Sequence, residues 1–281
     1  MEEIKQTLVI FGSPKLYFPS DVFKWMKLKA SPKMALKLMK VCKYFQHSNG
    51  FPFMVVKDIL KRGPTWILVT LDNKRITAES LEAISDKLWI VGKAEIYRSR
   101  KAIANLLLNT VVLNIQTLTL CGQNITINEF KLLTDGGTIE RCYMSKSTIT
   151  FENDEIVPLE DILECFPNAR MIDFRNKAPS FNSLEAAEAK ISSKLEKLTL
   201  FVDSKNFDVE TLVAYMKNHQ KIRYTIWFCR ISKVEFDQTI APSIDKLVQE
   251  WSPDYQVPKI YQHEKNDPIL FFSSCSCQAF E

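Results

Sequence analysis

The sequence predicts a mixed α/β fold, in which a short N-terminal helical module precedes an array of strands and helices with a mostly parallel sheet. Two observations indicate this fold: short β-like runs recur along the body of the chain, and capped helix starts fall between them. Such alternation favours parallel strands joined by helices. With 281 residues, 46% of them hydrophobic, the chain is long enough to bury a sizeable core.

The β-like runs are evenly spaced. Their centres lie 23 to 31 residues apart, and five of the six intervals fall within the 20–29 residues of a leucine-rich repeat. The body is therefore predicted to be an irregular leucine-rich-repeat-like solenoid, with its strands lining one face where a binding site would lie. The runs are Trp66–Leu71, Ala94–Tyr97, Thr117–Leu120, Ile139–Met144, Met171–Phe174, Leu198–Phe201 and Tyr224–Phe228.

Leucine patterns within the runs agree with this interpretation. Leu195, Leu198 and Leu200 form a clean LxxLxL, and Ile115, Leu118 and Leu120 form a close variant. The asparagine typical of the repeat corner is absent from most of the runs, so the repeats are expected to be irregular.

Helix starts are marked between the runs. Thr126 and Glu129 form a capping-box pattern, which predicts a helix that ends at Gly136 and Gly137. The other predicted helix starts are Pro158, before a helix over 159–166, Ser183, before 184–191, and Asp208, before 209–217.

The N-terminal part differs from the body in charge. Residues 1–64 hold 12 Lys or Arg against 4 Asp or Glu, whereas the remainder holds 25 against 29. Ser20 is predicted to cap a short apolar helix that ends near Lys29, and Pro32 to open a second helix that frays near His47. Residues 51–57 are expected to be extended or briefly helical. A basic head on a mildly acidic body suggests two parts with different partners.

This head resembles an F-box, in the divergent form of the expanded nematode F-box-like families. The resemblance covers residues 16–57. It is carried by Phe18-Pro19, by Asp21-Val22 at the first helix, by Pro32 before the second, and by the run from Leu36 to Phe45, which ends in Val-Cys-Lys-x-aromatic. Phe18 replaces the family's Leu, and Phe45 replaces its commoner Trp.

The resemblance implies a docking surface for the Skp-type adaptor of cullin-based (SCF) ubiquitin ligases. Adaptors of that family are acidic, so the seven lysines between Lys24 and Lys43 would steer the encounter. The alternative is that the same apolar residues form an intramolecular cap over the body. The family's contact positions correspond here to Pro19, Val22, Met26, Pro32, Leu36, Leu38, Met39, Val41, Cys42 and Phe45.

The predicted organisation has four parts. A hairpin of residues 257–263 and 269–272 is expected to close the last repeat. Cys275 and Cys277 are too few to hold a metal without a second pair of ligands, and no cofactor is expected. The parts are an extension over 1–15, the F-box-like module over 16–62, the repeat domain over 63–255, and the capping hairpin with a polar tail over 256–281.

The sequence predicts a binding protein rather than an enzyme. It contains three histidines, His47, His219 and His263, and none belongs to a recognisable catalytic or metal-binding motif. Two of them, His47 and His219, end predicted helices, where a histidine interacts with the helix dipole. Unpaired cysteines, with no signal-peptide pattern and no transmembrane run, favour a cytoplasmic or nuclear location and no membrane partner.

Three functions are compatible with these features of the sequence. The first is a substrate-recognition adaptor, with the head bound to the ligase and the body bound to a target protein. The second is a repeat-type protein-binding scaffold without a ligase, with the head acting as a solenoid cap. The third is nucleic-acid binding by the basic head, which lacks the alternation of aromatic and basic residues found in RNA-binding sheets. The first is the function that the sequence favours, and its target is not identified.

Overall fold

The computed structural model describes residues 19–30, 32–41, 45, 51, 53–84, 86–99, 101–203 and 207–263. The chain divides into two compact units, Met1–Pro52 and Phe53–Glu281. The boundary falls earlier than the sequence suggested, because residues 53–62, predicted to belong to the helical module, form a strand of the sheet.

The first unit contains two helices of ten residues, α1 (Ser20–Lys29) and α2 (Pro32–Val41). Ser20 is the first residue of α1, and Pro19 occupies the N-cap position without a side-chain hydrogen bond, so the predicted serine cap is wrong. Pro32 opens α2 as predicted, which agrees with the preference of proline for a first turn, where its missing N–H costs nothing.

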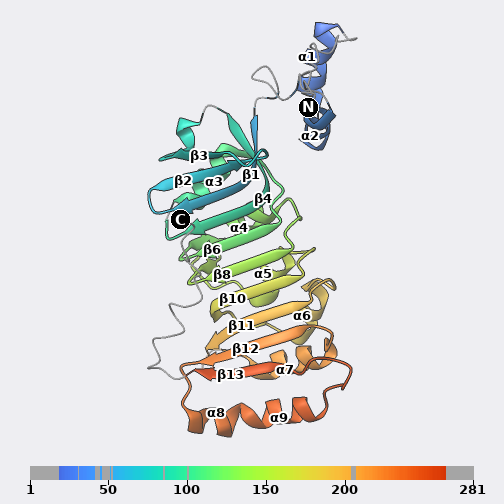
Figure 1. The fold of residues 1–281 in the computed structure, drawn as a ribbon. Coiled ribbons are helices and arrows are strands. Elements are labelled where there is room, and N and C mark those ends of the chain that lie inside the picture. The colour runs from blue at the N-terminus through green and yellow to red at the C-terminus, as the bar shows by residue number, and fades with distance from the viewer. Residues whose placement is uncertain are drawn as a thin grey trace, which may run out of the picture. The chain divides into compact units, whose positions relative to one another are not determined.

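The second unit is built on an 11-stranded sheet within the described residues (Figure 1). Parallel pairing runs from β1 through β13, and this confirms the predicted α/β class with a mostly parallel sheet. The parallel strands, in spatial order, are β1 (Phe53–Arg62), β4 (Lys87–Tyr97), β6 (Thr117–Cys121), β8 (Arg141–Ser145), β10 (Met171–Ala178), β11 (Lys197–Asp203), β12 (Arg223–Cys229) and β13 (Lys259–His263).

Shorter strands complete the sheets. At one end, β2 (Thr65–Thr70) and β3 (Arg75–Ala78) continue the sheet in antiparallel pairing beyond β1. The run that the sequence placed first in the parallel series is therefore a hairpin strand. In addition, β5 (Thr110–Leu113) pairs with β4, and β7 (Asn124–Thr126) pairs with β9 (Thr148–Thr150) in a separate two-stranded sheet.

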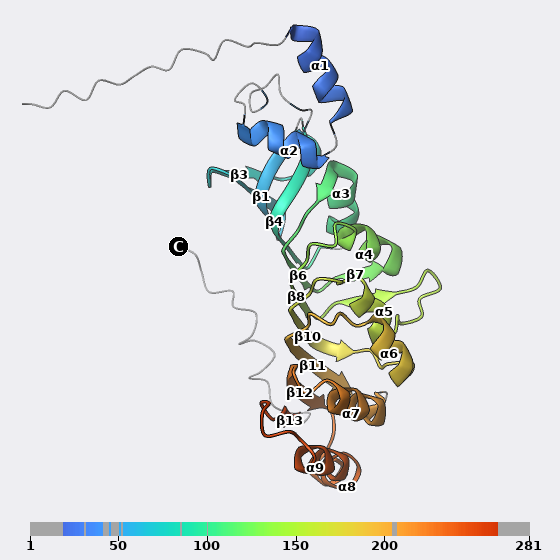
Figure 2. The ribbon, with the colours of Figure 1, turned by 90° about the vertical axis from the view of Figure 1, so that its right-hand side faces the viewer.

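Helices connect the parallel strands and cover one face of the large sheet (Figure 2). Three of the predicted starts are confirmed by their cap hydrogen bonds, at Thr126, Ser183 and Asp208. The connecting helices are α3 (Ala102–Asn109), α4 (Ile127–Thr134), α5 (Leu159–Glu164), α6 (Leu184–Lys190) and α7 (Val209–Asn218), with the 3-10 turn η2 (Leu81–Ala83) before β4.

The core between the sheet and these helices is formed by apolar residues at equivalent register positions of successive strands. Leu118 pairs with Cys142, Cys142 with Ile172, and Ile172 with Leu198, so equivalent positions of successive strands form one column. A second column holds Leu120, Met144, Phe174 and Leu200, and both columns are buried in a single apolar cluster. Each strand with its following helix buries its apolar side chains against the neighbouring ones, so no single strand–helix segment is expected to fold alone.

The far end of the sheet is closed by α8 (Lys233–Thr239) and α9 (Ala241–Gln249), which lie beyond β13 in Figure 1. Trp251 packs its ring edge-to-face against Tyr224 of β12. The predicted terminal hairpin is not seen within the described residues, where β13 pairs in parallel with β12. Its second strand, over 269–272, lies outside them.

Candidate functional site

The predicted adaptor-contact residues lie on α1 and α2 and beside them. Pro19 is exposed, and Val22 and Met26 are half-buried on one side of α1. Of the α2 positions, Leu38 and Met39 are half-buried, whereas Pro32, Leu36 and Val41 belong to the helix without described side chains. Cys42 lies outside the described residues.

Phe45 has a structural role in the first unit. Only 2% of it is exposed, and its ring lies 5.7 Å from that of Phe23 and 5.6 Å from that of Phe51, measured between centroids. Aromatic pairs at these separations add about 1 kcal/mol each beyond simple burial. Phe45 therefore supports the helices from within.

Two exposed apolar residues of α1 were not singled out by the sequence. Trp25 is 63% exposed and Leu28 is 82% exposed. Residues three apart share one helix face, so this pair forms an apolar surface patch, beside the exposed Lys24 and Lys29. The helical spacing of Trp25 and Leu28 opposite the buried Phe23 is the signal that could have found them.

The larger candidate surface is the face of the sheet opposite α3–α7, here called the open face. In the part of the chain that the structure describes, no helix of the second unit covers it (Figure 2). Side chains alternate across a strand, so the residues between the core columns point to this face. Among them are Glu95, Tyr143 and Thr225.

Basic residues form a row across the open face, at the first residues of β8, β11 and β12 and in the middle of β4. Lys93, Thr117, Arg141, Met171, Lys197 and Arg223 are successive register partners and form one column. We call Lys93, Arg141, Lys197 and Arg223 the basic column. Across the described residues, none of their side chains pairs with a carboxylate. Lys93, Lys197 and Arg223 each directly precede a run recognised in the sequence, and Arg141 lies within one, but only the parallel register shows that the four form one column.

Acidic groups on the same face have polar partners of two kinds. Asp173, which is buried, accepts hydrogen bonds from Nε of Arg175 at 3.1 and 3.0 Å, and Nη2 of Arg175 lies 2.9 Å from Oδ2, so its charge is paired. Glu95 accepts a hydrogen bond from the Tyr97 hydroxyl at 3.3 Å and keeps its negative charge beside Lys93. The other three members of the basic column, Arg141, Lys197 and Arg223, therefore carry most of the unpaired positive charge that the described residues place on this face.

An aromatic stack lies further along the strands of the open face. Trp227 lies between Phe201 and Tyr261, with ring centroids 5.4 and 4.2 Å away and interplanar angles of 16° and 19°. The three residues are register partners on β11, β12 and β13. Both faces of the Trp227 ring are therefore covered, whereas Phe201 and Tyr261 each have one face in the stack.

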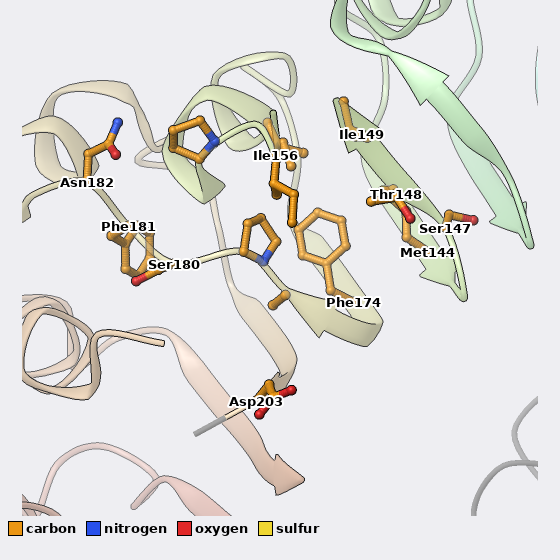
Figure 3. Close-up of a pocket in the computed structure, with 14 residues that line it drawn as sticks. Met144, Ser147, Thr148, Ile149, Ile156, Phe174, Ser180, Phe181, Asn182 and Asp203 are labelled. Carbon is orange, nitrogen blue, oxygen red and sulfur yellow. The ribbon is translucent and has the colours of Figure 1, made fainter. Parts of the chain in front are cut away.

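A cavity of about 390 Å³ lies at the carboxyl ends of β8, β10 and β11. Figure 3 shows Phe174 extending from β10 toward Ile156, with Asp203 on the neighbouring strand. The register between β10 and β11 shifts between Phe174 and Lys177, beside this cavity. Histidine, cysteine and lysine are absent from the described lining, so the cavity holds no paired nucleophile and base.

Ionisable groups nearby are held in their neutral forms. Burial raises the pKa of the Cys229 thiol to about 11, and the Asp203 carboxylate adds to the rise. Burial also raises the pKa values of Cys142 and Tyr215. A reactive thiol needs a lowered pKa, and burial shifts the pKa values of the Cys142 and Cys229 thiols the other way.

Metal-binding and membrane-spanning features were also sought. Residues 275 and 277, the cysteines considered as ligands, lie outside the described ranges. Within those ranges no three His, Cys, Asp or Glu side chains are grouped as a metal site would require. None of the described helices has both the length and the apolar character needed to cross a bilayer.

The chain was compared with known proteins. No protein-family model matches it, and no curated protein matches its sequence. The candidate surfaces therefore rest on the geometry of this chain alone.

Proposed function

We propose that the protein is a non-catalytic substrate-recognition adaptor of a cullin-type ubiquitin ligase. Its first unit binds a Skp-type adaptor, and its second unit binds a target protein. The observation that carries the proposal is the lysine-flanked patch of Trp25 and Leu28 on α1. An apolar patch with a basic rim suits an acidic partner with an apolar pocket, and exposed tryptophans are frequent anchors of such interfaces.

The mechanism is proximity. A target held by the second unit has its lysines at a high effective concentration near the ligase machinery, and the chemistry resides in the partners. Burial raises the pKa values of the Cys142 and Cys229 thiols, so neither of these two side chains is an activated nucleophile, in keeping with this mechanism.

The second unit is, in this proposal, an irregular leucine-rich-repeat array. Two pairs of leucines support it, because Leu118 and Leu120 of β6 occupy the same core columns as Leu198 and Leu200 of β11. The antiparallel β1–β2 pairing at one end is the kind of atypical end that repeat proteins use to close a core.

Co-expression of the full chain with a Skp-type adaptor, followed by size-exclusion chromatography, tests the proposal. The wild type is expected to co-elute, and Leu28→Asp to lose co-elution, since a carboxylate buried in an apolar interface costs several kcal/mol. Leu132→Asp is the matched control, because Leu132 of α4 is 60% exposed and lies in the other unit. It is expected to co-elute as the wild type does.

Leu36→Asp and Met39→Asp extend the test to α2 and separate the adaptor from a solenoid cap. Loss of co-elution by variants that keep the wild-type melting temperature supports the adaptor. Failure of the wild-type chain to co-elute, with both variants unfolding it, would instead favour a repeat-type scaffold whose head is an internal cap.

A further inference from the structure

The open face carries charge and apolar surface in separate columns. The basic column contributes four cationic side chains without carboxylate partners among the described residues, whereas Asp173 is neutralised by Arg175. The aromatic stack of Phe201, Trp227 and Tyr261 contributes apolar edges. A partner must therefore bring negative charge to one side of its contact surface and apolar groups to the other.

The separation of the two columns restricts the shape of the partner. Lys197 and Phe201 lie four positions apart on β11, which is about 13 Å at about 3.3 Å per residue. An α-helix with side chains is about 10–12 Å across, so where both columns are present, on β11 and β12, it fits between them with one flank on each. A single extended strand is too narrow to reach both.

The length of the basic column sets the length of that helix. The column crosses the neighbouring strands β4, β6, β8, β10, β11 and β12, which lie about 4.8 Å apart, so it extends over about 24 Å. A helix that rises about 1.5 Å per residue covers this distance in about sixteen residues.

The aromatic stack argues against a nucleic acid in the same place. Bases bind sheets by stacking on exposed ring faces. Here both faces of Trp227 are covered, by Phe201 at 5.4 Å and Tyr261 at 4.2 Å. Ring edges instead suit the packing of aliphatic side chains.

We propose that the open face binds an acidic amphipathic helix of a partner protein, which lies across the strands between the basic column and the aromatic stack. This inference deepens the proposed function and rests on it for one point, that the helix belongs to a recruited target. The binding itself requires no Skp-type adaptor, so it is measured without one.

The probe is a fluorescent synthetic helix of about sixteen residues, with glutamates along one flank and leucines along the adjacent flank. Fluorescence anisotropy with the full chain is expected to give saturable binding that weakens as salt rises. The same helix with lysines in place of glutamates is expected to bind at least tenfold more weakly, because it meets like charge.

Two variants test the columns separately. Lys197→Glu combined with Arg223→Glu is expected to weaken probe binding about tenfold and to flatten its salt dependence. Lys131→Glu, on the helix-covered side, is the matched control and is expected to leave binding unchanged. Trp227→Leu, which keeps an apolar residue but removes the stack, is expected to weaken binding while the salt dependence is retained.

The outcomes separate this inference from the adaptor proposal. Equal binding of the acidic and basic probes, or no effect of the double variant, overturns the inference while co-elution with the Skp-type adaptor is unaffected. Tighter binding of a single-stranded oligonucleotide than of the acidic probe overturns it in favour of a nucleic acid. If the wild type is a dimer and the double variant is a monomer, the open face binds a second copy of the chain, and the inference is overturned as well.

Discussion

The indole ring of Trp227 stacks on the phenol ring of Tyr261, with the centroids 4.2 Å apart and the planes inclined by 19°. The two residues lie on adjacent parallel strands, and Phe201 covers the opposite side of the indole. The last strand of the sheet is therefore held by side-chain stacking as well as by backbone hydrogen bonds.

Trp227→Ala removes both stacking contacts and is expected to lower the free energy of unfolding by about 2–3 kcal/mol. Tyr261→Ala removes one contact from a more exposed position and is expected to cost about 1 kcal/mol. Urea denaturation of the two variants measures the difference. Equal losses would show that the stack does not stabilise β12 from both sides.

Glu160 is completely buried, and its Oε1 and Oε2 accept hydrogen bonds from the Asn182 backbone N–H at 3.0 and 3.3 Å. Glu160→Ala leaves that N–H unsatisfied and is expected to destabilise the fold by about 3 kcal/mol. Glu160→Gln keeps an acceptor oxygen and is expected to cost about 1 kcal/mol. Thermal unfolding ranks the two; an alanine variant as stable as the glutamine variant contradicts the role.

Gly136 leaves no room for a side chain, since an added Cβ would lie 2.0 Å from the Leu113 carbonyl oxygen. Gly136→Ala must displace backbone and is expected to cost about 3 kcal/mol. Gly63 has a φ of 58° with open space around it, so Gly63→Ala should cost only about 1 kcal/mol for its left-handed backbone. The midpoints of chemical denaturation distinguish steric conflict from backbone strain, and the reverse order would refute this account.

Asp208 caps α7 and gives its stability a pH dependence. The Thr211 hydroxyl and then its backbone N–H donate to the carboxylate, which lowers the pKa of Asp208 below its usual value. A lowered folded-state pKa stabilises the protein above the unfolded-state pKa of about 3.9, and this stabilisation is lost as the pH falls through the folded-state value. Asp208→Asn should therefore be less stable than the wild type at pH 6.

The difference should start to shrink below about pH 4, where the unfolded-state carboxyl takes up a proton, and should vanish below the lower folded-state pKa, where the folded wild type is neutral too. Melting temperatures of both proteins between pH 6 and pH 2.5 provide the measurement. A gap that stays constant over this range would exclude the carboxylate charge as its cause. Thr211→Val removes the hydroxyl donor, so the melting temperature of this variant should change less between pH 6 and pH 2.5 than that of the wild type.

The repeated part of the sheet was predictable from the sequence because its signals are local. The strands around Leu118, Leu198 and Ile226 match predicted runs, and the capping box of Thr126 and Glu129 closes in both directions, at 3.3 and 3.1 Å. Each of these patterns lies within the strand or helix that it predicts, so it can be recognised without knowing the tertiary structure.

The first strand was predicted only in part: residues 51–57 were expected to be extended or briefly helical, and the sequence did not place 53–62 in the sheet. The pairing of β1 with both neighbours shifts register between Val56 and Asp58, so its buried residues do not alternate regularly. Asp58 itself accepts a hydrogen bond from the Lys93 backbone N–H at 2.9 Å, a contact between residues far apart in sequence. The basic column could not be predicted for a related reason, because its members become neighbours only through the register of separate strands.

Strand direction reverses between β1 and β2, and this limits where a duplicated strand–helix segment can be inserted. Duplication of a strand–helix segment lengthens a parallel sheet only where the new strand meets parallel neighbours, and β2 and β3 present an antiparallel edge beyond β1. New segments are therefore accommodated between β4 and β13. Each one inserted there would add another register position beside Arg141 and Lys197, so a duplicated segment would lengthen the open face without rebuilding the ends of the sheet.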